Sequence, residues 1–183
     1  MSEPRLRLFV ALDLPPAVRA RLAQWCERVA PAGVRRVPAE NLHVTLAFLG
    51  SRRDDEAAAV AGLLARVATA CPVGALATAG ALWLPPRRPG VLTVAIAAEE
   101  SFAALQAVLV DGLRDAIAFE PERRAFRAHV TVGRVARGAR VAAVALDPPP
   151  VLAFAPETLT LYRSLSGRGG ARYEPLARAP VSS

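Results

Sequence analysis

The chain has 183 residues, of which 53% are hydrophobic and 21% charged, a composition that excludes a disordered tail and is long enough to bury a core. No apolar run approaches the roughly 18 residues of a membrane span, and two cysteines without a C-x-x-C pair exclude a disulfide framework and a common structural zinc site. The net charge is +7 and all 23 basic side chains are arginine, which suits a polyanionic partner but is also the bias of a GC-rich genome.

The first half of the sequence predicts alternating strands and helices. Residues 5–12 read as a strand, and Pro15 and Pro16 then open a helix that runs to about Val29, because proline fits a first helical turn. The elements expected after a short loop are a strand over 41–49 that Gly50 stops, a helix over 54–69 with three acidic residues at its start, and a strand over 73–84.

The second half of the sequence repeats this order. Its expected elements are a strand over 91–97, a helix from Glu99 to about Ile117, a strand over 127–135, and further strands near 151–162 and 171–177. We therefore predict one bilobal domain over 1–183, with halves at about 1–84 and 90–183. The expected fold class is α+β, with two pseudo-symmetric lobes, a mainly antiparallel sheet in each, helices outside and the active cleft between them. Strand exchange between the lobes is left open.

The only two histidines of the chain occur in the same local sequence, His43-Val44-Thr45 and His129-Val130-Thr131. Side chains alternate between the faces of a strand, so each strand presents an imidazole and a hydroxyl together on one face. Two unrelated structural histidines would have no reason to share this context. If the lobes pair about a pseudo-twofold axis, the two sets face each other across the cleft.

This arrangement has the groups that phosphodiester chemistry needs. An imidazole titrates near neutral pH, so two of them can donate and accept a proton in one turnover. Threonine hydroxyls can donate to nonbridging phosphate oxygens, and arginine can offset the charge that develops on phosphorus. Such a site uses no metal and no other cofactor.

Around these residues the sequence resembles the two-histidine (2H) phosphoesterase superfamily, and most closely its RNA 2′,3′-cyclic phosphodiesterase (LigT-like) branch. The stretches that carry the resemblance are 7–12, 38–50, 161–164 and 170–173, together with the two motifs. The resemblance implies hydrolysis of RNA 2′,3′-cyclic phosphate ends to 2′-phosphomonoesters. It implies that His43 is the proton donor and His129 the proton acceptor.

The resemblance also implies that Thr45, Thr131 and Arg134 hold the phosphate. Ideal alternation would point Arg134 away from the face of His129, so its contribution requires a bulge at Gly133 or the end of the strand there. The candidates for contacts with RNA are Phe9, Phe48, Arg127, Tyr162, Arg163, Ser164 and Arg172. The aromatic residues among them would stack on a base or belong to the core, and the basic ones would touch phosphates or form a plain hairpin surface.

The expected partner is RNA with a 2′,3′-cyclic phosphate end, or a nucleoside 2′,3′-cyclic phosphate. The start of the chain lacks the long apolar region of a signal peptide, so we expect a cytoplasmic protein, monomeric and not bound to a membrane. Two alternatives of the same fold are an RNA end-joining enzyme and a phosphodiesterase for a small cyclic nucleotide. An alternative of another class is a basic RNA-binding module without turnover.

Overall fold

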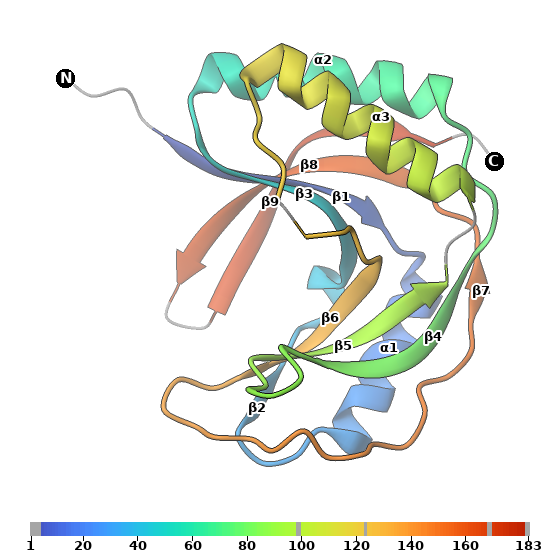
Figure 1. Ribbon diagram of the computed structural model, residues 1–183, viewed down its shortest axis with the longest axis vertical. Helices are drawn as coiled ribbons and strands as arrows, with labels where there is room; N and C mark the ends of the chain where they lie inside the picture. Colours follow the sequence, from blue (N-terminus) through green and yellow to red (C-terminus); the bar gives the residue numbers. More distant parts are fainter. Residues whose placement is uncertain (1–4, 98–99, 123, 168–169, 182–183) are drawn as a thin grey trace.

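The structure is a computed structural model that describes residues 5–97, 100–122, 124–167 and 170–181. Figure 1 shows its elements, which in chain order are β1 (Leu6–Asp13), α1 (Pro16–Val29), β2 (Val34–Arg36), the 3-10 helix η1 (Ala39–Asn41), β3 (His43–Arg52), α2 (Asp54–Ala70), β4 (Leu76–Leu84), β5 (Val91–Ala97), α3 (Glu100–Ile117), β6 (His129–Val135), β7 (Ala153–Phe154), β8 (Thr158–Gly167) and β9 (Gly170–Pro180).

The described strands form one curled antiparallel sheet in the order β7-β4-β5-β6-β3-β1-β8-β9, with β2 pairing with β6 off this path. The predicted α+β class with a mainly antiparallel sheet is confirmed. β3 and β6 are joined by a single register pair, Val44 with Val130, and the sheet divides there into two halves. Each half of the sheet contains strands from both halves of the sequence, because β4 pairs with β5 on one side, while β8 and β9 extend the side of β1 and β3 on the other.

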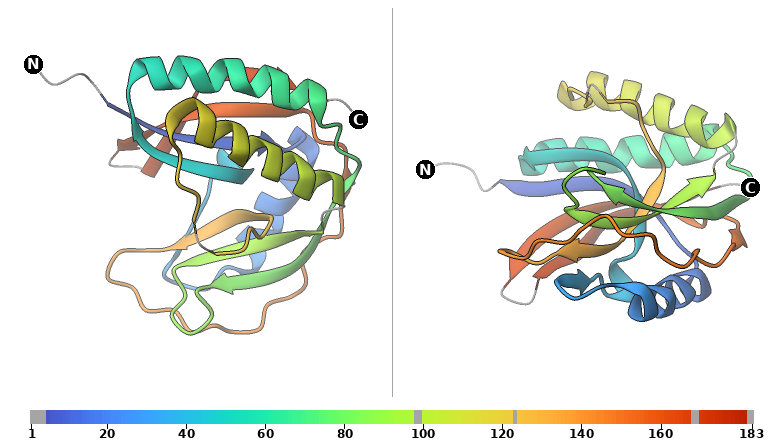
Figure 2. Two further views of the ribbon diagram at one scale, coloured as in Figure 1. Left: turned by 45° about the horizontal axis from the view of Figure 1, so that its top comes forward. Right: turned by 60° about the horizontal axis from the view of Figure 1, so that its bottom comes forward.

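The helices lie on the outer sides of this sheet (Figures 1 and 2). α2 packs against α3 and against β8 and β9, whereas α1 packs against β2 and β6. Gly112 lets α3 approach α2 closely, because a Cβ atom there would lie 2.5 Å from Cδ1 of Leu63. With the helices outside, the inner faces of the two halves are left to line a cleft.

Several predicted element ends were wrong. β3 continues to Arg52 because Gly50 adopts φ +72° and still pairs with Leu8 of β1, as Ser51 and Arg52 pair with Arg7 and Leu6. The strand expected over 73–84 begins only at Leu76. The strand expected over 151–162 is two strands, separated at Pro156, which lacks a ladder donor. α3 begins at Glu100 among the described residues, and Glu99, its predicted start, lies outside them.

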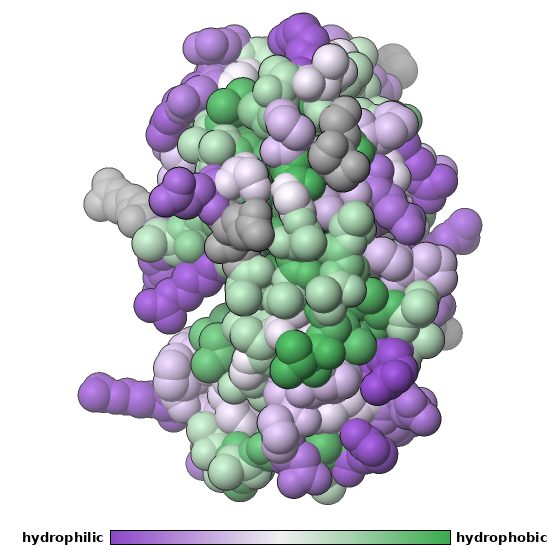
Figure 3. Space-filling view, turned by 90° about the vertical axis from the view of Figure 1, so that its right-hand side faces the viewer, coloured by the Kyte–Doolittle hydropathy of each residue, from purple (hydrophilic) through white to green (hydrophobic). Residues whose placement is uncertain are grey.

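The two ends of the sheet are poor templates for pairing with another chain. β7 is only two residues long, and β9 carries Pro175 and Pro180. Figure 3 shows the side on which β7 lies, with apolar groups gathered across the middle and hydrophilic groups above and below.

None of the helices in the described part of the chain combines the length and apolarity needed to cross a membrane.

Candidate active site

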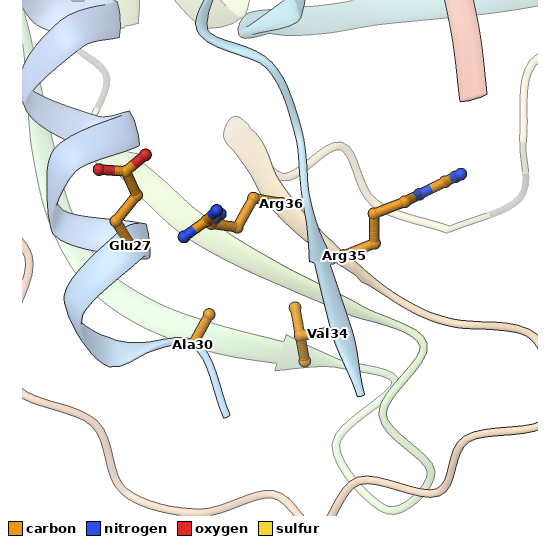
Figure 4. A pocket seen from close by; sticks show the side chains of 5 residues that line it. All are labelled: Glu27, Ala30, Val34, Arg35 and Arg36. Carbon is orange, nitrogen blue, oxygen red and sulfur yellow. The ribbon is translucent and has the colours of Figure 1, made fainter. Parts of the chain in front are cut away.

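A cleft of about 620 Å³ opens where β3 and β6 separate. Its lining residues come from β1, β2, β3, β6, β8, β9 and the adjoining loops, and are Arg7, Leu8, Phe9, Arg35, Val37, Asn41, His43, Thr45, Phe48, Gly50, Glu122, His129, Thr131, Arg134, Ser164, Ala171 and Tyr173. A smaller hollow of about 360 Å³ lies between α1 and β2 and includes neither histidine (Figure 4).

The two His-x-Thr units meet in the larger cleft. The middle residues, Val44 and Val130, are fully buried register partners, which turns the histidine and threonine on each side of them toward the cleft. In an antiparallel pair centred on these valines, each histidine lies opposite the threonine of the other strand. The two histidines are then diagonal neighbours, a relation whose spacing in a regular antiparallel ladder is roughly 7–8 Å.

Backbone carbonyls fix both imidazoles in the same tautomer. Nδ1 of His43 lies 2.8 Å from the carbonyl oxygen of Asn41, and Nδ1 of His129 lies 2.7 Å from that of Arg127. Because a carbonyl only accepts, each Nδ1 carries the hydrogen and each Nε2 is left for chemistry. Nε2 of His43 is 3.1 Å from Oγ1 of Thr45, so this hydroxyl donates to the neutral ring.

Aromatic rings enclose His43. Phe9 stacks on it with ring centroids 4.9 Å apart, and Tyr173 meets it edge-on at 5.3 Å. Burial lowers the pKa of His43 to about 4, because an imidazolium loses hydration there. The bond to Asn41 and the charge of Asp13 raise this pKa again, while the charges of Arg134 and His129 lower it.

A carboxylate with two hydrogen bonds belongs to the residue that pairs with His43 on β1. Asp13 is the β1 register partner of His43. Its carboxylate accepts from the hydroxyl of Tyr162 at 2.7 Å and from that of Thr160 at 2.8 Å. Burial, and then the bond to Asp13, raise the pKa of Tyr162 to about 12. The pair fixes Asp13 beside the strand that carries His43.

Matching bulges follow the two histidine motifs. In β6, Thr131 pairs with Thr93 and Gly133 with Leu92, which leaves Val132 as an extra residue. Each bulge places two consecutive buried residues in its strand and so reverses the alternation of faces.

In β3 the register shifts in the same way after Thr45 and leaves Leu46 as the extra residue. Phe48 and Arg134, each five residues after a histidine, therefore return to the cleft. The bulge considered for Arg134 is present, and the side chain of Phe48 is 61% exposed.

The other predicted contact residues divide into two groups. Phe9 and Ser164 line the cleft together with Phe48. Tyr162 stacks behind Phe9 at 5.2 Å, and Arg163 lies 3.8 Å from Glu174. The side chains outside the lining are those of Arg127, Tyr162, Arg163 and Arg172. Residues 168 and 169, which stand between Arg163 and Arg172 in the sequence, lie outside the described residues.

Sequence reasoning missed five polar or aromatic residues of the lining, namely Arg7, Arg35, Asn41, Glu122 and Tyr173. Strand alternation would have indicated Arg7, which shares a face with Phe9. Asn41 has a second contact besides its carbonyl, because its Nδ2 donates to the carbonyl oxygen of Ala171 at 3.1 Å. This bond joins the segment before His43 to β9, and no local pattern indicates it.

In the described part of the chain, no three His, Cys, Asp or Glu side chains gather in a way that could hold a metal ion.

The family model "LigT like Phosphoesterase" matches residues 12–93. The RNA 2′,3′-cyclic phosphodiesterase of Escherichia coli strain K12 is 32% identical over 186 residues, which cover 97% of either chain. The protein of the same name from Archaeoglobus fulgidus is 30% identical over 133 residues, covering 72% of this chain and 74% of that one.

Solved structures show the same likeness. The crystal structure of E. coli LigT complexed with NADP+ matches with a TM-score of 0.80 and 30% identity, covering 98% of this chain and 100% of that chain. A crystal structure from Thermus thermophilus matches with a TM-score of 0.77 and 27% identity, covering 96% and 98% of the two chains. These matches confirm the resemblance found in the sequence, and the chain belongs to the LigT-like phosphoesterase family.

Proposed function

We propose that this protein hydrolyses 2′,3′-cyclic phosphates on RNA ends to 2′-phosphomonoesters, with His43 as the proton donor and His129 as the proton acceptor. The observation that carries the proposal is the meeting of two His-x-Thr units, from β3 and β6, in one cleft. The name of the E. coli relative, RNA 2′,3′-cyclic phosphodiesterase, supports the substrate.

The hydrogen bonds support this assignment of roles. Since the carbonyl of Arg127 holds the Nδ1 hydrogen of His129, the lone pair of this ring is on Nε2, where it can take a proton from the attacking water. Protonated His43 would give its Nε2 proton to the departing 3′ oxygen. Once His43 carries that proton, the hydroxyl of Thr45 no longer donates to the ring and is free to donate to the phosphate.

The other groups would stabilise the transition state. Thr131 and Arg134 line the cleft beside His129 and can donate to nonbridging oxygens as negative charge grows on them. No step of this mechanism uses a cofactor. The expected partner is an RNA end or a nucleoside cyclic phosphate. We also propose a monomer in the cytoplasm, where two free cysteines such as Cys26 and Cys71 stay reduced.

The position of the product phosphate has to be measured. Structures of E. coli LigT contain NADP+ or 3′-AMP, which carry phosphate on a 2′ and a 3′ oxygen respectively. Purified protein should be incubated with an RNA that ends in a 2′,3′-cyclic phosphate, and the product compared with 2′- and 3′-phosphorylated standards. A 3′-phosphate product would contradict the proposed leaving group.

The same assay separates the rival functions. His43→Ala and His129→Ala should each lower the rate about 100-fold or more, with circular dichroism to show that both variants fold. EDTA should leave the rate unchanged, and strong inhibition by EDTA would contradict a metal-free mechanism. Adding an RNA with a 5′ hydroxyl tests end joining, and ADP-ribose cyclic phosphate tests a small substrate. Salt-sensitive RNA binding without any product would indicate a binding module instead.

A further inference from the structure

The cleft carries more positive charge than the reacting phosphate requires. Its lining includes three arginines, Arg7, Arg35 and Arg134, and one glutamate, Glu122. A 2′,3′-cyclic phosphodiester has a single negative charge, which Arg134 and protonated His43 already exceed. The surplus positive charge indicates that a second anionic group enters the cleft with the substrate.

Arg35 is the arginine whose position is hardest to explain without such a group. It lies on β2 directly opposite Arg134 of β6, so the two side chains start from the same face of the sheet. Like charges placed directly opposite each other destabilise a strand pair. Among the ion pairs of the described residues, none includes Arg35 or Arg134. A bound anion would relieve this repulsion.

Figure 4 shows that the two arginines of β2 point in opposite directions. Arg36 extends toward α1 and Glu27, whereas Arg35 extends to the other side of the strand, where it lines the cleft. Neighbouring strands are about 4.8 Å apart, so Arg35 is one strand further from the centre of the site than Arg134. It is placed to bind a phosphate next to the reacting one.

We propose that Arg35 binds the phosphodiester on the 5′ side of the terminal nucleotide, so that the cleft recognises an oligonucleotide end in preference to a lone nucleoside cyclic phosphate. The cyclic phosphate ends the RNA at its 3′ side, so the next phosphate along the chain is the one 5′ of the terminal nucleotide. This inference rests on the proposed function, because it assumes that the cyclic phosphate reacts between His43 and His129.

The test compares two substrates, a nucleoside 2′,3′-cyclic phosphate and a dinucleotide that ends in the same cyclic nucleoside. The wild-type protein should have the higher kcat/KM for the dinucleotide. In Arg35→Ala the ratio of the two kcat/KM values should fall about 10-fold or more, the usual effect of losing a charge-assisted hydrogen bond. Arg36→Ala is the matched control, since it removes the same charge from the opposite face of β2, and should keep the ratio.

Salt dependence gives a second measurement. For the dinucleotide, the slope of log kcat/KM against log salt concentration should become shallower by about 0.7 in Arg35→Ala, the effect of one phosphate contact with a single strand. Arg35→Lys keeps the charge and should retain most of the slope. Arg35→Ala should also fold, because this substitution removes a repulsion between two arginines, and urea unfolding checks this.

Two results would overturn the inference while leaving the proposed function intact. One is a wild-type protein that hydrolyses both substrates with equal kcat/KM. The other is an Arg35→Ala variant that loses activity equally on both, which would assign Arg35 to the reacting phosphate. Absence of turnover of either substrate by the wild-type protein would instead overturn the proposed function.

Discussion

The protonation of His43 offers a direct test of the site. Burial beside Phe9 and Tyr173 lowers its pKa from 6.5 to about 4. A difference of this size means that charging the ring costs about 3 kcal/mol more than in water. At pH 7 only about one free protein molecule in a thousand would then carry the proton on His43. A general acid that starts in this state needs a partner that raises its pKa.

The negative charge of a bound phosphate is large enough to raise the pKa of His43. Two unit charges about 4 Å apart interact with about 4 kcal/mol at an effective dielectric constant of 20. This attraction is similar in size to the cost of charging the buried ring of His43, so the two nearly cancel. We therefore expect the pKa of His43 to return close to neutrality when an anionic phosphate occupies the cleft, and to be low when the cleft holds only water.

The measurement is a pH titration by NMR of protein with ¹⁵N-labelled histidine. The chain has only two histidines, so a His129→Ala sample assigns both signals. The pKa of His43 should be about 4 in the free protein and above about 6 with saturating inorganic phosphate. A pKa of about 6 or higher without phosphate would refute the argument from burial. A value still near 4 with phosphate bound would refute the role of His43 as the acid.

Three further predictions concern stability and are checked by urea unfolding. Relative to His43→Asn, the wild-type protein should lose about 3 kcal/mol of unfolding free energy as the pH falls from 6.5 to 4. In this pH range the unfolded chain protonates the imidazole of His43 and the folded chain does not. An equal pH dependence of stability in the two proteins would contradict the low pKa. Gly133→Ala should lower the free energy of unfolding by about 1–3 kcal/mol, since its Cβ would lie 2.6 Å from a side chain of β2. Gly80→Ala is the control, because a Cβ there would have nothing within 4 Å. Equal losses of stability in the two variants would remove the steric explanation. Tyr162→Phe should cost about 1–2 kcal/mol through the lost bond to Asp13, and a change near zero would show that water replaces the hydroxyl without loss.

Long elements with a regular apolar pattern were predictable from the sequence alone. The predicted strand over 91–97 has the same bounds in the structure, and the predicted helix over 54–69 differs from α2 by one residue. β2 was not predictable, because its three residues, Val-Arg-Arg, have no alternation that distinguishes a strand from a loop. They form a strand because β6 offers them an edge to pair with.

The candidate site divides in the same way between local and distant causes. Alternation along one strand is enough to predict that each histidine shares a face with the threonine two residues later. The side on which Arg134 points depends on a bulge, and a bulge depends on how β5 and β6 pair. Tyr173 and the side chain of Asn41 contribute through β9, more than a hundred residues from the first motif. Such contacts become visible only when the sheet is assembled.

The two motifs share their local sequence but differ in their surroundings, and this difference can decide which histidine donates the proton. His43 is enclosed by rings from β1 and β9, whereas the carbonyl that holds His129 belongs to Arg127, an exposed residue of the loop before β6. Even the matching positions after the bulges differ, since Phe48 is apolar and Arg134 is charged. A ring that is costly to charge gains its proton mainly when an anion is present. An acid in the position of His43 would therefore become protonated when the anionic substrate binds.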